Sequence, residues 1–103
     1  MITRGTAPIN TFSLPVDASL VSKVRVNYKQ QDKLVIIKTE AHEDTVMEER
    51  ALQVRLTQRE TLDLQEGCSV LIQVDVLATD GTPYRSNIVH DYVGRCLNDE
   101  VLE

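Results

Sequence analysis

The sequence predicts an all-β fold, an immunoglobulin-like antiparallel β-sandwich of six to seven strands with one short helical crossover. Short segments in which apolar and polar residues alternate recur along the chain, with turn-forming residues between them. Aromatic residues make up only 4% of the chain, so the core must be built from Val, Leu and Ile, which favour pleated sheet. Residues 69–93 form two such segments around Asp80-Gly81, and a helical crossover before a terminal hairpin favours the immunoglobulin-like arrangement.

A chain of 103 residues is expected to form one domain, because it is long enough to bury a core of its own. We expect residues 1–7 to be a flexible N-terminal arm, residues 8–94 to be the β-sandwich domain, and residues 95–103 to be a polar C-terminal tail.

The first strands follow from alternation. Residues 8–14 alternate weakly and end at Pro15, which cannot donate a hydrogen bond to a sheet. Residues 23–29 alternate strictly, which turns Val24, Val26 and Tyr28 inward. Residues 33–40 follow a short turn and are apolar on both faces in their first half. Such a strand is covered on both sides, or its outer face meets a partner.

Residues 41–51 are ambiguous. Thr45 with Glu48 matches a capping box, so a single helical turn is one reading. A strand start followed by a polar hairpin loop is the preferred one, because strands flank the segment. Residues 52–56 then alternate as a strand, and a second capping box, Thr57 with Glu60, predicts a one-turn helix that carries the chain to the other sheet.

The register of the last hairpin can be argued from its side chains. A two-residue loop at Asp80-Gly81 would mix apolar and polar partners, and a slip of one residue reverses every side chain. A three-residue loop over residues 79–81 avoids this, with Gly81 as the left-handed residue. It sets Asp75 opposite Arg85 on the outer face and places His90 on the inner face. Its other pairs are Val76 with Tyr84, Val74 with Ser86, and Ile72 with Ile88.

No pattern in the sequence indicates catalysis, and we expect a protein that is not an enzyme. His42-Glu43-Asp44 is the one local group of metal-type ligands, but zinc and calcium sites need more ligands at other spacings. Cys68 and Cys96 are too few for a disulfide scaffold and form no CxxC, so we expect free thiols, with a single bridge where two strand ends meet as the alternative. No neighbour of Cys68 would lower its thiol pKa, which argues against a nucleophile there. No cofactor is expected, since the four glycines are isolated.

Charge and hydropathy exclude several classes of partner. The net charge of −5 disfavours nucleic acid, which needs clustered Lys and Arg. No apolar run is long enough to span a bilayer, and residues 1–6 lack the apolar core of a signal peptide. We therefore expect no membrane partner and a protein that is cytoplasmic when made.

Protein contacts remain as the main hypothesis, with other subunits, including copies of this chain, as partners. The predicted faces turn an apolar set outward: Val35, Ile37, Leu71, Leu77 and Val89. Either another segment of the chain covers them or they form a subunit contact. The alternative function is a non-catalytic ligand- or glycan-binding module, but alternation places Phe12 and the three tyrosines on the core side, which leaves few aromatic faces for a sugar.

Three stretches, read together, resemble small uncharacterised β proteins from prophages and mobile elements of Gram-positive bacteria. They are Arg4-Gly5-Thr6-Ala7-Pro8 with Thr11-Phe12-Ser13-Leu14-Pro15, Leu56-Thr57-Gln58 with Thr61-Leu62, and Asp80-Gly81-Thr82 with Ser86-Asn87-Ile88. The resemblance implies a virion or tail-associated structural component, incorporated into a particle after synthesis. It carries over no functional residues.

Overall fold

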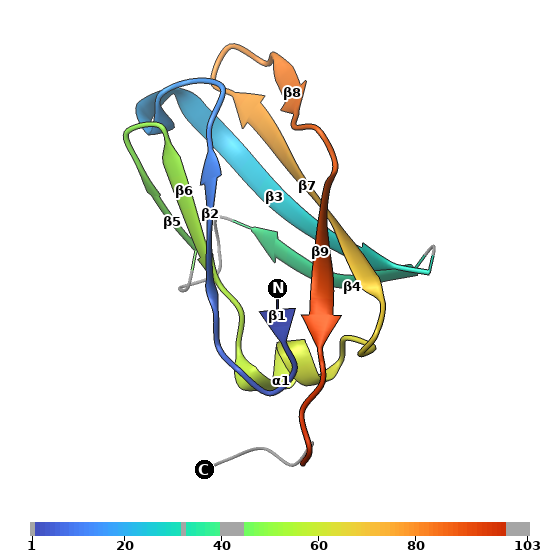
Figure 1. The fold of residues 1–103 in the computed structure, drawn as a ribbon. Helices are drawn as coiled ribbons and strands as arrows, with labels where there is room; N and C mark the ends of the chain where they lie inside the picture. Colours follow the sequence, from blue (N-terminus) through green and yellow to red (C-terminus); the bar gives the residue numbers. More distant parts are fainter. Residues whose placement is uncertain (1, 32, 40–44, 99–103) are drawn as a thin grey trace.

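The computed structural model describes residues 2–31, 33–39 and 45–98, which form a two-layer β-sandwich (Figure 1). The larger sheet has six strands in the order β1-β9-β7-β3-β4, with β8 also paired to β7, and the smaller sheet has the order β2-β6-β5. In chain order the elements are β1 (Ile2–Thr3), β2 (Ile9–Ser13), the 3-10 helix η1 (Ala18–Leu20), β3 (Val21–Gln30), β4 (Lys33–Thr39), β5 (Thr45–Glu48), β6 (Ala51–Arg55), α1 (Gln58–Leu62), β7 (Ser69–Ala78), β8 (Pro83–Arg85) and β9 (Val89–Gly94).

The predicted fold class, a β-sandwich with one short helix, is confirmed, while the immunoglobulin-like detail stays a prediction. All strand pairs are antiparallel except β1 with β9, which is parallel. The described residues contain nine strands rather than six or seven. The difference arises at β1, which was not expected, and in the last hairpin, whose second strand is divided into β8 and β9.

The core lies between the sheets and is aliphatic, as the scarcity of aromatic residues predicts. Strands β3 and β7 supply much of it, because every second side chain is buried from Val24 onward in β3 and from Val70 onward in β7. The buried side chains of β3 include the predicted set Val24, Val26 and Tyr28. From the smaller sheet and the segment after it come Leu52, Val54 and Leu56, each 0% exposed.

The predicted helical crossover and the strand reading of residues 45–48 are both confirmed. The Thr57 hydroxyl accepts from the Glu60 backbone N–H at 3.2 Å, and the Glu60 carboxylate accepts from the Thr57 N–H at 2.8 Å. This capping box starts α1, which joins β6 of the smaller sheet to β7 of the larger one (Figure 1). Thr45–Glu48 is a strand paired with β6, so the hairpin reading of that segment is confirmed over the helical one.

The expectation of a free N-terminal arm is wrong for residues 2–6. Ile2 pairs with Val93 and is only 2% exposed. The Thr61 hydroxyl accepts from the Gly5 N–H at 3.0 Å and contacts the Thr6 carbonyl oxygen at 2.7 Å. The arm is held because its backbone groups find partners on β9 and α1, which lie far away in sequence.

The predicted hairpin register holds up to Ser86 and then fails. The loop at residues 79–81, with Gly81 at φ +89°, and the pairs of Val76 with Tyr84 and Asp75 with Arg85 are confirmed. The chain leaves the sheet between β8 and β9, and Ile72 then pairs with Val89 rather than Ile88. One extra residue reverses the faces of everything beyond it.

Candidate interaction surface

The surface that gathers most of the predicted residues is the side of the larger sheet that faces away from the smaller sheet, called here the outer face. Residues that pair directly across antiparallel strands share a face, so the register defines its members. Strand β3 contributes Lys23, Arg25, Asn27 and Lys29, and β7 contributes Leu71, Gln73, Asp75 and Leu77. The face is completed by Leu34, Ile37 and Thr39 from β4, Arg85 from β8, and His90 and Tyr92 from β9. Ile88, in the segment before β9, lines a depression on the same face.

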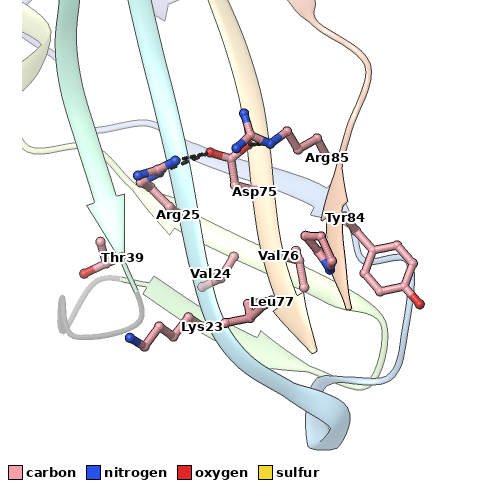
Figure 2. A pocket seen from close by; sticks show the side chains of 10 residues that line it. Lys23, Val24, Arg25, Thr39, Asp75, Val76, Leu77, Tyr84 and Arg85 are labelled. Carbon is pink, nitrogen blue, oxygen red and sulfur yellow. Dashed lines mark hydrogen bonds and ion pairs between the residues drawn. The ribbon is translucent and has the colours of Figure 1, made fainter. Parts of the chain in front are cut away.

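Asp75 lies at the centre of this face. Its Oδ2 accepts from Arg25 Nε at 3.1 Å, from Arg25 Nη2 at 2.8 Å and from Asn27 Nδ2 at 2.9 Å. Arg85 Nε lies 3.8 Å from Oδ1 on the other side, and Figure 2 shows the two guanidinium groups flanking the carboxylate. The Asp75 side chain is 14% exposed, whereas those of Arg25 and Arg85 are 51% and 67% exposed. The carboxylate is therefore recessed beneath two outward arginines.

Two shallow depressions adjoin this ion cluster, and both include Arg25, Asp75 and Arg85 in their walls. The first, of about 390 Å³, also has Lys23 and Leu77 in its lining (Figure 2). The second has a volume of about 340 Å³. Its apolar lining consists of Leu34, Ile37, Leu71, Ile72 and Ile88.

Three of the five predicted surface residues lie where alternation placed them. Ile37, Leu71 and Leu77 are on the outer face, and Ile37 is 45% exposed. Val35 is not, because it is the extra residue of a β-bulge between the pairs Tyr28–Ile36 and Lys29–Leu34, and it packs against the core. Val89 shares a face with Ile72 instead of Leu71, because of the extra residue before β9.

Two apolar residues of this surface were missed, Leu34 and Ile88, which are 52% and 53% exposed. Leu34 lies next to the bulge and Ile88 lies next to the break in the hairpin, so strict alternation assigned each to the wrong side. The pairing of Arg25 with Asp75 was missed as well. It depends on β3 lying beside β7, which no local pattern in either strand specifies.

Phe12, Tyr28 and Tyr84 lie on the core side as predicted, whereas Tyr92 and His90 do not. Tyr28 is buried and its hydroxyl accepts from Asn10 Nδ2 at 2.8 Å; burial raises its pKa to about 12. Tyr84 is partly buried against the core, as predicted. Tyr92 is 53% exposed and His90 is exposed, because the shifted register pairs them with Ser69 and Leu71 on the outer face.

The candidates for chemistry do not form a recognisable catalytic group within the described ranges. His42 lies outside the described residues. Cys68 and Cys96 are free thiols. The Cys68 carbonyl oxygen accepts a hydrogen bond from the Val93 N–H, whereas His90 pairs with Leu71. Cys68 and His90 therefore lie at different positions along the strands and on different faces of the sheet. In the described part of the chain, no three His, Cys, Asp or Glu residues are grouped as metal ligands would be.

Comparisons of the chain with protein-family models, with curated proteins and with solved structures found no match. Among residues 2–31, 33–39 and 45–98, no helix has the length and apolar character needed to cross a membrane. The arrangement of the outer face offers ionic contacts at the arginines, backed by apolar contact at Leu34, Ile37 and Ile88.

Proposed function

We propose that this chain is a non-catalytic structural or adaptor protein of phage type, which acts by binding other protein subunits through its outer face. One observation carries the proposal: Leu34, Ile37 and Ile88 are each about half exposed and border one depression on a single sheet face. Exposed apolar side chains gathered in one place are typical of association surfaces. The resemblance to prophage proteins supports the phage-type role.

The smaller sheet provides a comparison within the same molecule. Its own outward side chains are largely polar, although Ile9 and Val46 are 53% and 50% exposed. These two residues match Ile88 and Ile37 in exposure and shape, but no charged cluster comparable to that at Asp75 lies between them in the described residues. They therefore serve as a control for loss of apolar surface alone.

The test is formation of a complex by purified protein, either with itself or with the products of the neighbouring genes, measured by light scattering and co-elution. The variant Ile37→Thr with Ile88→Thr keeps β-branched side chains and removes apolar surface. We expect it to weaken the complex at least tenfold, while Ile9→Thr with Val46→Thr leaves it unchanged. A monomer that binds none of these proteins, or a complex that both variants preserve, contradicts the proposal.

A second candidate, a non-catalytic ligand- or glycan-binding module, is favoured by the exposure of Tyr92 on the outer face. Stacking of a sugar on an aromatic ring would need its face. In an NMR titration with cell-surface glycans, this candidate predicts shifts near Tyr92 that Tyr92→Phe preserves and Tyr92→Ala abolishes. Glycan binding that is unchanged in the Tyr92→Ala variant would contradict this candidate.

A further inference from the structure

Charge is distributed unevenly between the outer face and the rest of the protein. The chain has 11 Lys and Arg against 16 Asp and Glu. Four of the basic residues, Lys23, Arg25, Lys29 and Arg85, lie on the outer face, where the registers of the described strands place one carboxylate, Asp75. Elsewhere in the described residues there are seven basic and eight acidic side chains. The outer face is therefore basic, with four cationic side chains around one carboxylate, whereas the charges of the other described residues nearly balance.

Asp75 does not cancel this charge at the surface. It is recessed, and the exposed parts of Arg25 and Arg85 stand between it and solvent. Arg25 contacts Asp75 through Nε and Nη2 and not through Nη1, and Arg85 makes one long contact of 3.8 Å. A guanidinium group carries five N–H donors, so both retain donors for a further carboxylate.

We propose that the outer face binds an acidic segment of another protein, whose carboxylates meet Arg25, Arg85 and Lys29 while its apolar side chains cover Leu34, Ile37 and Ile88. The inference rests on the proposed function and names the chemistry of the partner. Charge complementarity carries it, because four basic side chains surround one recessed carboxylate on this face and attract an acidic ligand to it.

Two other occupants fit the face less well. A second copy related by a two-fold axis would set the basic face against itself, since such a contact uses the same patch twice. A nucleic acid would match the charge, but its phosphate backbone offers little apolar surface to Leu34, Ile37 and Ile88, and the −5 net charge opposes a long polyanion.

The probe is a fluorescein-labelled peptide in which Glu alternates with Leu over nine residues, with fluorescence anisotropy as the readout at low and at physiological salt. A matched peptide has Gln in place of every Glu. We expect the Glu peptide to bind at least tenfold more tightly than the Gln peptide, and more weakly as salt rises. The variant Arg25→Gln with Arg85→Gln is expected to lose at least tenfold in affinity for the Glu peptide.

The matched control is Arg55→Gln with Arg59→Gln, which removes two exposed arginines from outside the outer face and is expected to bind as the unaltered protein does. Equal binding of the Glu and Gln peptides, or indifference to Arg25→Gln with Arg85→Gln, overturns the acidic partner and leaves the proposed function standing. If neither the Glu peptide nor the Gln peptide binds, the acidic partner is overturned as well. If, in addition, the double variant Ile37→Thr, Ile88→Thr retains every complex that the unaltered protein forms, the proposed function is contradicted as well.

Two outcomes would name another occupant and so overturn the proposal. One is an oligothymidylate that binds as tightly as the Glu peptide and with the same dependence on Arg25 and Arg85. The other is self-association, seen by light scattering, that Arg25→Gln with Arg85→Gln abolishes.

Discussion

Ile2→Ala tests whether the N-terminal residues belong to the folded domain. Ile2 is 2% exposed, pairs with Val93 and is part of the hydrophobic core. Truncation of a buried Ile to Ala costs ~2–5 kcal/mol, from lost transfer energy and from the cavity left behind. Strand β1 has two residues and one described neighbour, β9, so the site can partly collapse, and we expect ~2–3 kcal/mol, the lower part of that range.

The measurement is urea unfolding followed by circular dichroism, with the dependence of the unfolding free energy on urea compared between variants. A loss of this size corresponds to a fall in the melting temperature of roughly 10–15 °C in a domain of this length. Ile9→Ala makes the same chemical change at a side chain that is 53% exposed, and it should cost about 0.5 kcal/mol or less. If the two variants have the same stability, the N-terminal residues are a free arm and the packing of β1 described above is refuted.

Three further substitutions test single contacts. Thr57→Ala removes the acceptor for the Glu60 N–H and should cost ~1 kcal/mol in chemical denaturation, whereas Thr57→Ser should retain the stability. Because burial raises the pKa of Tyr28 to about 12 from its ordinary 10.0, the folded state keeps a proton that the unfolded chain has lost. That stabilisation is fully present below pH 10 and falls as pH rises toward 12, by up to ~3 kcal/mol, in unfolding measured across this range. Tyr28→Phe should lack this component of the pH dependence; an identical profile would contradict it. Gly81→Ala should lower stability by ~1 kcal/mol in thermal unfolding because φ is +89°, and Gly81→Asn should lower it less.

The parts of the fold that the sequence predicts are those set by near neighbours. Alternation along β3 and β7 gives the buried face of each strand, and the Thr57–Glu60 capping box starts α1 within four residues. The loop at residues 79–81 follows from Gly81 and the flanking strands. Each of these depends on chemistry that acts within one turn or one strand, so a single sequence contains it.

The parts that could not be predicted depend on partners far along the chain. Strand β1 forms because it pairs with the edge of β9, which lies some 90 residues later in the chain. The residues around Ile2 alone do not indicate this pairing. The same limit applies to the candidate site. The Asp75–Arg85 pair lies within one hairpin and was predicted, whereas Arg25 reaches Asp75 from a strand 50 residues away and was not.

The two irregularities in the larger sheet decide the shape of the outer face. The bulge at Val35 leaves Leu34 on the same side as Ile37, and the break before Val89 leaves Ile88 beside the same depression. Bulges re-aim side chains in this way at sheet edges and near functional sites. Leu34 pairs with Lys29, which pairs with Leu71, so Leu34 lies four residues along β3 from Arg25 and its partner Asp75. An extended segment rises ~3.3 Å per residue, so about four or five residues laid along β3 can place an apolar side chain at Leu34 and a carboxylate on Arg25 and Arg85.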